Sequence, residues 1–332
     1  MKSYIKAIEY YLPDQKEYND PEDKMTKKIG ITVKNIAAEN EYASDLAINA
    51  ANKIFKSGAC QASEIDFLIY CTQSPDYYLP TTACILQDKL GLSTSCGALD
   101  INLGCSGYVY GLSLAKGLIE AGMAKNIMFI TSDTYSKYIN PKDRNVKLLF
   151  GDAAAATLIS GDDEINESMI GPFIFGTDGK GAEHLIVPAG GLREPITPES
   201  YEETLDNVGN SRSRANLYMN GNEIFNFAVI QVPKAVQELC DRNHMVLDDF
   251  NYFVFHQANQ YMLETLRRKM DIPREKFSIQ FADCGNTVSS TIPIALIRDF
   301  KEGKVKNGDK VLLVGFGVGL SWGVCSITMK IN

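Results

Sequence analysis

The sequence predicts an α/β fold built from two duplicated halves. Apolar helices alternate with short apolar strands along most of the chain, which is the pattern of sheets that are covered by helices. The strands are nearly continuous apolar runs, so we expect them to be buried on both faces in mostly parallel sheets. The order of helices, strands and polar turns in the first half recurs in the second.

The first recurring unit is an amphipathic helix followed by a buried strand. In the first half the helix covers 41–57 and the strand covers 66–71. In the second half the helix covers 222–240 and the strand covers 251–256, which ends at His256. The same plan therefore occurs twice.

The second recurring unit is a polar turn followed by a helix and a strand. Cys105 precedes an apolar helix and the strand 126–130. Asn286 precedes a helix over 289–302 and the strand 310–314 in the same way. Cys105 and Asn286 are 181 residues apart, close to the 185 residues that separate the ends of the two strands of the first unit. These nearly equal distances indicate an internal duplication.

The duplication predicts two domains and the position of a site. We expect an N-terminal half over 1–170 that carries the candidate Cys, and a C-terminal half over 171–332 that carries the candidate His and Asn. Corresponding strand ends then meet between the halves, where ligands bind in α/β folds. The stretch 189–216, rich in Pro, Gly, Ser, Asp and Glu, is expected to be a long loop that covers the pocket.

Charge and composition disfavour several classes of protein. The net charge is −8 with a pI near 5.1, and no run of Lys or Arg is long enough to follow a phosphate backbone, so we expect no nucleic-acid partner. No apolar run reaches the roughly 18 residues of a membrane span, and no hydrophobic signal region is present, so we expect a cytoplasmic protein without a membrane span. A basic patch at 267–269 suits either an acidic carrier protein or a solvated helix face.

The eight cysteines do not form the pattern of a disulfide framework or a metal site. There is no Cys-x-x-Cys pair and no His at metal-ligand spacing, so we expect no metal. In a reducing compartment each cysteine is by default a small buried apolar residue. A nucleophilic role therefore needs support from the local sequence.

Cys105 has such support. It lies in Asn-Leu-Gly-Cys-Ser-Gly at 102–107, between the strand 98–101 and the start of a helix. Glycines on both sides allow a sharp turn that presents the sulfur, as in a nucleophile elbow. The positive end of the helix dipole favours a thiolate at that place. The alternative is a small residue chosen for close packing of helix and strand.

Two further residues are candidates for the same site. His256 ends an apolar strand, and its alternative role is that of a strand-end histidine with satisfied hydrogen bonds. Asn286 lies in Asp-Cys-Gly-Asn-Thr at 283–287, and its alternative role is that of a turn or helix-capping residue. The glycine-rich segment 315–323 joins two strands, allows close backbone approach and offers a main-chain N–H to an oxyanion. It lacks the helix start and the Lys-Ser/Thr of a phosphate-binding loop.

Six motifs along the chain form a specific set. They are Gly-Cys-Ser-Gly at 104–107, Phe-Gly-Asp at 150–152, Met-Asn-Gly-Asn-Glu-Ile-Phe at 219–225, His-Gln-Ala-Asn at 256–259, Gly-Asn-Thr at 285–287 and the Phe-Gly-Val-Gly…Trp-Gly loop at 316–323. Together the segments from Tyr4 to Ile331 resemble β-ketoacyl-acyl-carrier-protein synthase III, a condensing enzyme of the thiolase superfamily. The resemblance implies a thiolase-like fold of five layers, α-β-α-β-α.

The resemblance also implies an acyltransferase reaction. Cys105 would take an acyl group from an acyl-CoA or acyl-carrier-protein thioester, and His256 and Asn286 would donate hydrogen bonds to the thioester oxygen of malonyl-ACP as it loses CO₂. The main-chain N–H groups of Cys105 and Val318 would hold the oxyanion. The product would serve fatty-acid or specialised acyl-chain biosynthesis. Coenzyme A and phosphopantetheine thioesters enter as substrates, so no cofactor is implied, and a homodimer is implied.

Substrate contacts are implied at a second set of positions, and some of these depart from the family pattern. The set is Arg144, Asn222, Phe225, Phe316 and Leu79. Arg144 matches an adenine-side arginine, whereas Lys24 and Lys28 stand where many members have a Trp and an Arg. The Gln-Tyr pair at 260–261 replaces an entrance arginine, and Val318 replaces a glycine. Leu79 stands where an aromatic side chain often limits the acyl pocket from the partner subunit. We therefore expect intact chemistry with altered recognition of donor or carrier.

Other functions remain open at this stage. A Cys-His-Asn thioester hydrolase orders its residues in the same way, although the duplication disfavours it. A relative that transfers the acyl group to a hydroxyl or amine without decarboxylation is a closer rival. A silent partner subunit would be expected to lose Cys105 or His256. Plant-type polyketide synthases usually have Pro-Gly after the histidine. The length and branching of the acyl chain are not predicted.

Overall fold

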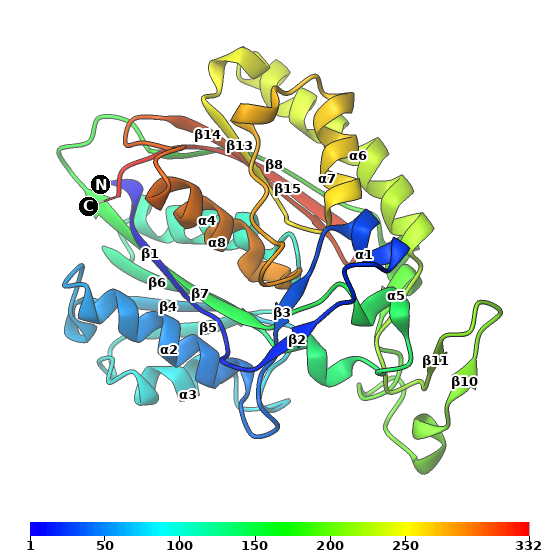
Figure 1. Cartoon of the computed structure of the whole chain (residues 1–332). Coiled ribbons are helices and arrows are strands. Elements are labelled where there is room, and N and C mark those ends of the chain that lie inside the picture. Colours follow the sequence, from blue (N-terminus) through cyan, green and yellow to red (C-terminus); the bar gives the residue numbers. More distant parts are fainter. Residues whose placement is uncertain (332) are drawn as a thin grey trace.

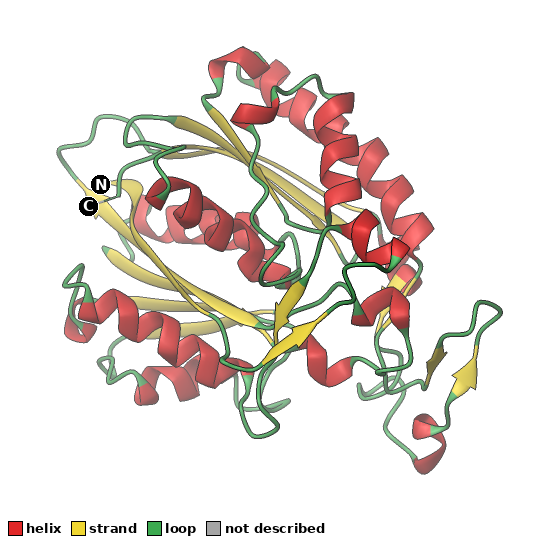
Figure 2. Cartoon of the chain, in the orientation of Figure 1, coloured by secondary structure: helices red, strands yellow, loops and turns green. Residues whose placement is uncertain are grey.

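The structure, a computed structural model, describes residues 1–331. Layers of helices and layers of strands alternate through it (Figures 1 and 2). The outer helices on the first sheet are α2 (Ala43–Lys56) and α3 (Thr82–Lys89), the central helices are α4 (Gly107–Glu120) and α8 (Thr291–Lys301), and the outer helices on the second sheet are α6 (Gly221–Arg242) and α7 (Gln260–Lys269). The predicted order of layers, α-β-α-β-α, is confirmed.

Each sheet draws its strands from one part of the chain. The first has the order β1 (Lys2–Tyr11), β7 (Ala153–Asp162), β6 (Asn126–Asp133), β4 (Phe67–Cys71) and β5 (Gly97–Ile101). The second has the order β13 (Tyr252–Phe255), β14 (Lys310–Gly317), β15 (Ser321–Thr328) and β8 (Ile170–Thr177). The domain boundary at residue 170, where β8 begins, stays a prediction.

The prediction of mostly parallel sheets is wrong. β4 pairs in parallel with β5 and β6, and β13 with β14, but the remaining pairings of the two sheets are antiparallel. β14 returns as β15 after the three residues 318–320, and so short a connection permits only antiparallel pairing. The strands are apolar because helices cover both faces, and this burial does not depend on strand direction.

The duplicated units occupy corresponding places in the two sheets. α4 follows Cys105 and leads to β6, while α8 follows Asn286 and leads to β14. Both helices lie between the sheets (Figure 1), and α4 contacts the short helical turn Val288–Ser290 that precedes α8, so the turns at their N-termini meet. Where the first sheet has β5, the second has only the isolated bridge between Phe253 and Phe277.

Capping residues explain part of the sequence motifs. Asn220 accepts the N–H of Glu223 (3.2 Å) and begins α6, and Asn259 accepts the N–H of Met262 (3.0 Å) and begins α7. Each side chain satisfies one of the N–H groups that a helix leaves unpaired in its first turn. The last Asn of His-Gln-Ala-Asn therefore fixes the start of a helix beside the site.

Short elements lie at one end of the central helices (Figure 1). They are α1 (Lys24–Ile29), α5 (Arg144–Lys147), β2 (Lys16–Tyr18), β3 (Val33–Asn35), β9 (Leu185–Ile186), β10 (Thr204–Leu205), β11 (Ser211–Arg212) and β12 (Tyr218–Met219). Among residues 1–331 no helix has the length and hydropathy needed to cross a bilayer.

Two glycines of α4 should respond oppositely to replacement by Ala. A Cβ at Gly111 would overlap the buried ring of Phe129, so Gly111→Ala is expected to destabilise the fold by about 1–3 kcal/mol. A Cβ at Gly117 would meet no atom within 4 Å, so Gly117→Ala should stabilise it by about 0.5–1 kcal/mol through helix propensity. Denaturant unfolding of both variants measures the difference, and equal stabilities would contradict the described packing of α4 on β6.

Candidate active site

A pocket of about 770 Å³ lies at the N-terminal ends of the two central helices. Cys105, His256 and Asn286 all line it, although they come from different turns of the two halves. The structure thus brings together the three side chains that the sequence singled out. Their chemical roles stay predictions.

The turn that carries Cys105 lies against two glycines of the other half. A Cβ at Gly317 would lie 2.8 Å from Cys105 Cβ and 2.9 Å from its Sγ, and a Cβ at Gly315 would lie 2.8 Å from Ser106 Cα. Distances under 3.0 Å are not compatible with real side chains at these positions. The close backbone approach predicted for the glycine-rich segment is confirmed, except that both glycines lie within β14 rather than in a loop.

A chain of hydroxyl groups fixes the tight turn between β14 and β15 on the nucleophile. Ser106 Oγ and Ser321 Oγ lie 2.7 Å apart, and Ser321 Oγ donates to the carbonyl oxygen of Val318 (2.9 Å). The N–H groups of Val318 and of Cys105 itself face the Cys105 thiol, and both lower its pKa. The two main-chain donors that were predicted for an oxyanion therefore lie beside the sulfur.

The thiol itself is protonated at rest. Burial is the main cause that raises the pKa of Cys105 to about 12; the negative charge of Asp133 also raises it, and the N–H groups of Cys105 and Val318 lower it. The expectation of a thiolate, based on the helix dipole, is therefore wrong, because loss of solvent outweighs the local donors.

His256 is held as a neutral imidazole. Its backbone N–H donates to Val314 (2.7 Å), and its ring packs edge-on against Phe316 with centroids 5.5 Å apart. Burial lowers the pKa of His256 to about 3. A neutral imidazole has one donor and one acceptor nitrogen, so it can accept a proton or donate a hydrogen bond, according to its tautomer.

Thr291 controls which nitrogen of His256 carries the proton. Its Oγ1 lies 2.7 Å from His256 Nδ1 and 3.0 Å from the carbonyl oxygen of Val288. When the hydroxyl donates to Val288, Nδ1 carries the proton and Nε2 is a base. When the hydroxyl donates to Nδ1, Nε2 carries the proton and is a donor. No sequence motif indicates the role of Thr291, which lies 35 residues from His256 in the chain.

The side chain of Asn286 is oriented by its own turn. Its Oδ1 accepts the N–H of Val288 (2.9 Å), which leaves the Nδ2 hydrogens facing the pocket. The backbone is held on both sides, since Asn286 N donates to Leu149 (2.9 Å) and Gly151 N donates to Asn286 (3.0 Å). A Cβ at Gly151 would overlap the carbonyl of Cys284, so the glycine of Phe-Gly-Asp permits this contact.

Val288 adopts a backbone conformation that is unusual for its residue type. Its φ is 55°, in the left-handed region that β-branched residues avoid. In this conformation its N–H meets Asn286 and its carbonyl accepts from Thr291. Strain of this kind, about 1–3 kcal/mol, persists at functional sites when the surroundings impose it. No sequence pattern signals it.

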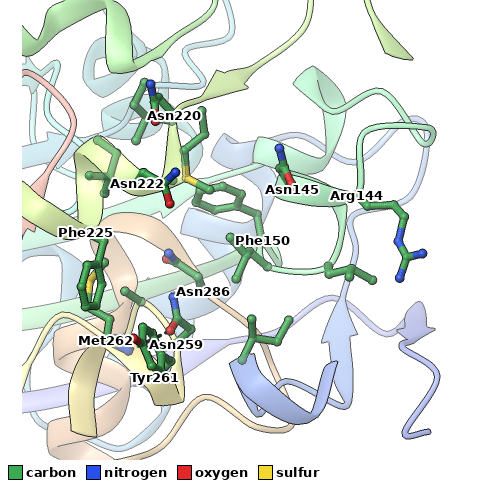
Figure 3. A pocket seen from close by; sticks show the side chains of 18 of the residues that line it. Arg144, Asn145, Phe150, Asn220, Asn222, Phe225, Asn259, Tyr261, Met262 and Asn286 are labelled. Atoms are coloured by element: carbon green, nitrogen blue, oxygen red, sulfur yellow. Dashed lines mark hydrogen bonds between the residues drawn. The ribbon is translucent and has the colours of Figure 1, made fainter. Parts of the chain in front are cut away.

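The residues predicted to contact substrate are only partly gathered in the pocket. Arg144, Asn222, Phe225 and Phe316 line it, but Leu79 does not and is 82% exposed. Figure 3 shows Arg144 at the edge of the site, with its guanidinium pointing away from Asn286. Arg144 donates to Asp23 Oδ1 (2.9 Å), the residue that caps α1.

The mouth differs from the expectation at α1 and α7. Lys28 lines the pocket, but Lys24 does not, and Met25 does instead. Lys28 Nζ lies 4.2 Å from the centroid of the Tyr261 ring, whose other neighbour is the stacked ring of Phe225 at 5.2 Å. The sequence indicated that an arginine is replaced here, but it did not predict this stack of side chains.

The long excursion over 189–216 reaches the mouth as expected. The tip of its hairpin, at 206–208, lines the outer part of the pocket. Arg212 anchors the hairpin through Asp143 (2.8 Å) and Asp206 (3.0 Å). Among the described residues no cluster of three His, Cys, Asp or Glu side chains is arranged to hold a metal ion.

Comparison with known proteins gives the family. Residues 99–179 match the family described as 3-Oxoacyl-[acyl-carrier-protein (ACP)] synthase III, and residues 240–329 match its C-terminal part. The β-ketoacyl-[acyl-carrier-protein] synthase III of Clostridioides difficile is 36% identical over 330 residues, which cover 97% of each chain. The chain belongs to the 3-oxoacyl-[acyl-carrier-protein] synthase III family. It is therefore a condensing acyltransferase of fatty-acid biosynthesis, and hydrolysis is not favoured.

Solved structures of the synthase III family have the same fold throughout. A crystal structure of 3-oxoacyl-(acyl-carrier-protein) synthase III at 2.1 Å is 48% identical, covers 99% of this chain and 100% of that chain, and has a TM-score of 0.97. The 3-oxoacyl-(acyl-carrier protein) synthase of Burkholderia xenovorans is 36% identical, covers 99% and 95%, and has a TM-score of 0.88. The thiolase-like prediction is confirmed.

Burial of His256 should make stability depend on pH. Its pKa is about 3 in the folded chain and 6.5 ordinarily, so between these values the unfolded chain binds the extra proton. Stability is therefore lost as pH falls from about 6.5 toward 3, by up to about 1.4 kcal/mol per pH unit. Denaturant unfolding of the wild type and His256→Asn between pH 5 and 8 should show a smaller slope in the variant. His244→Asn, at an exposed position, is the matched control, and an equal reduction in both variants would contradict the assignment to His256.

Proposed function

We propose that the enzyme condenses an acyl thioester with malonyl-ACP in two steps through an acyl group on Cys105. The observation that carries the proposal is the shared pocket, in which a buried thiol, a neutral imidazole and an oriented amide face the same space. The thiol can form a thioester bond, and the other two groups can donate hydrogen bonds to an oxygen.

In the first step the sulfur of Cys105 attacks the carbonyl of the acyl donor. The S–C bond forms, the donor thiolate leaves, and the thiol proton passes to it by way of His256 Nε2. The main-chain N–H groups of Cys105 and Val318 support the developing oxyanion. Since the pKa of the thiol is about 12, proton transfer accompanies the attack rather than preceding it.

In the second step malonyl-ACP loses CO₂ and its carbanion attacks the acyl-cysteine. Negative charge develops on the malonyl thioester oxygen, to which Asn286 Nδ2 and His256 Nε2–H donate hydrogen bonds. The new C–C bond forms as the bond from carbon to the Cys105 sulfur breaks, and the released thiolate takes up a proton from solvent. The products are a 3-oxoacyl-ACP, CO₂ and the free thiol. No resident cofactor is needed, because the thioesters enter as substrates.

Recognition of the donor and carrier is proposed for the outer pocket and α7. Arg144, Lys28 and the Asn222 amide offer positive or polar groups along the channel. Arg268 on α7 is exposed, whereas Arg267 is held by Glu264 (2.9 Å), so the basic patch presents mainly Arg268 and Lys269. An acidic carrier protein fits this surface. A reducing cytoplasmic location suits a reaction that needs the free thiol.

A homodimer is proposed through the edge of the first sheet. β5 is an edge strand whose residues are half-buried and mostly apolar, and an unpaired edge of this kind favours pairing with another chain. Tyr77, Tyr78 and Leu79 are exposed on the loop before α3. Leu79 does not line the pocket of its own chain, which fits a role in lining the pocket of the partner subunit.

Asn286→Ala is expected to separate the two steps. Acylation of Cys105 should continue, while decarboxylation of malonyl-ACP should fall about 10² to 10³-fold, equivalent to about 2.7–4 kcal/mol. Intact-mass analysis with a panel of acyl thioesters, followed by malonyl-ACP and product analysis, measures both steps, and Cys105→Ser is the control for the acyl adduct. Equal loss of both steps would contradict these roles. Steady release of free acid without a C–C product would favour a hydrolase.

Leu79→Lys is expected to weaken the dimer. The wild type should sediment at twice the 36.7 kDa mass of the chain, and loss of a buried Leu should raise the dissociation constant more than about tenfold. Leu205→Lys, at an exposed position on β10, is the matched control. A monomeric wild type would refute the interface.

A further inference from the structure

A buried carboxylate lies behind the candidate site without lining it. Asp133 is the last residue of β6, and its side chain has no exposed surface. It does not contact the pocket, and the proposed reaction gives it no role. Burying an ionisable carboxyl group is costly unless it is hydrogen-bonded, so its partners indicate what it does there.

One oxygen of Asp133 reaches the side of the nucleophile. Oδ1 accepts the N–H of Gln73 (2.8 Å), the second residue after β4. The Gln73 side chain donates to Asn102 Oδ1 (3.2 Å), at the start of the turn that carries Cys105. The same side chain lies so close to Gly104 that a Cβ there would be 2.5 Å from Gln73 Oε1. Asp133 thus fixes the residue that supports the nucleophile turn.

The other oxygen reaches the turn of the second half. Oδ2 accepts the hydroxyl of Ser289 (2.6 Å), which is 156 residues away in the chain, and the N–H of Ser289 also donates to the carboxylate. Ser289 follows Val288, the residue that orients Asn286 through its N–H and Thr291 through its carbonyl. The carboxylate therefore anchors the strained segment that aims both proposed donors.

The charge of Asp133 is also felt at the sulfur. After burial, it is the next cause that raises the pKa of the Cys105 thiol. The other titratable groups that feel this carboxylate are Cys71, Tyr70, Tyr135, Tyr138 and the buried Asp152. Burial raises the pKa of Asp133 to about 7, so at pH 8 the carboxylate is mostly ionised.

We propose that Asp133 is a positioning residue for the decarboxylation step: its carboxylate ties the turn of Asn286 to the turn of Cys105 across the two halves. This inference rests on the proposed function. Asp133 would align the two donors, Asn286 and His256, with the acyl-cysteine although it touches neither substrate. A displacement of about 1 Å at such a site costs about 10²-fold in rate.

Asp133→Asn tests the proposal because it keeps the shape but removes the charge and one acceptor oxygen. Decarboxylation of malonyl-ACP by the acyl-enzyme is expected to fall about 10²-fold, while acylation of Cys105 is retained. Alkylation of Cys105 by iodoacetamide at pH 8, measured by mass spectrometry of its peptide, should become faster, because loss of the negative charge lowers the pKa of the thiol. Greater exposure of the buried thiol would also speed alkylation, so the rate is measured across a range of pH: loss of the charge moves the pH profile to lower pH, whereas a merely structural effect raises the rate without moving the profile.

Asp299→Asn is the matched control. Asp299 is equally buried and hydrogen-bonded, to Ser278 and Gln280, but it lies in α8 away from the pocket. This variant should leave both decarboxylation and alkylation near the wild-type rates. Equal losses of decarboxylation in the two variants, or a wild-type rate in Asp133→Asn, would overturn the proposal.

If Asp133→Asn does not fold, Ser289→Ala provides a second test of the proposal. It removes one hydrogen bond to the carboxylate and leaves the charge, so decarboxylation should fall about tenfold with unchanged alkylation. An unchanged rate of decarboxylation would overturn the proposal. If the wild type forms a C–C product and the Asp133 and Ser289 variants form it at the wild-type rate, this inference alone fails. If the wild type forms none, the proposed function fails first.

Discussion

The contact between the Cys105 turn and the glycines of β14 is the constraint on which the rest of the structure depends. A side chain at Gly315 or Gly317 would occupy the space of the turn, so the backbone of one half can approach Cys105 of the other only without Cβ atoms. This approach brings the N–H of Val318 to the sulfur. The duplicated halves are therefore in close contact beside the pocket that Cys105, His256 and Asn286 line.

The local order of the fold could be predicted from the sequence, and the directions of the strands could not. Apolar periodicity predicted α2 and α6 to within a few residues of their bounds, and the glycines around Cys105 predicted the turn that carries it. The prediction of parallel pairing was wrong because an apolar strand is buried equally well in either direction. The internal duplication predicted the two halves, their central helices and the meeting of the three pocket residues, because equal spacing in the two halves brings corresponding turns together.

The finer parts of the site could not be predicted, because they depend on hydrogen bonds between distant segments. Ser289 meets Asp133 over 156 residues, and Ser106 meets Ser321 over 215. A Ser in a turn has many possible partners, and the sequence does not select one. The left-handed backbone of Val288 opposes its own residue preference, so local propensity predicts the wrong conformation there. Burial likewise reversed the expected state of the thiol, because the cost of desolvation is set by the whole fold.

The stack at the mouth changes what this entrance offers to a ligand. The Tyr261 ring stacks on Phe225, with centroids 5.2 Å apart, and the ammonium group of Lys28 lies 4.2 Å from the Tyr261 centroid. An arginine at such a place offers a flat surface for stacking as well as charge, whereas an ammonium group offers charge alone. A ligand at this entrance therefore meets an ammonium charge beside an aromatic ring that is already stacked on another ring.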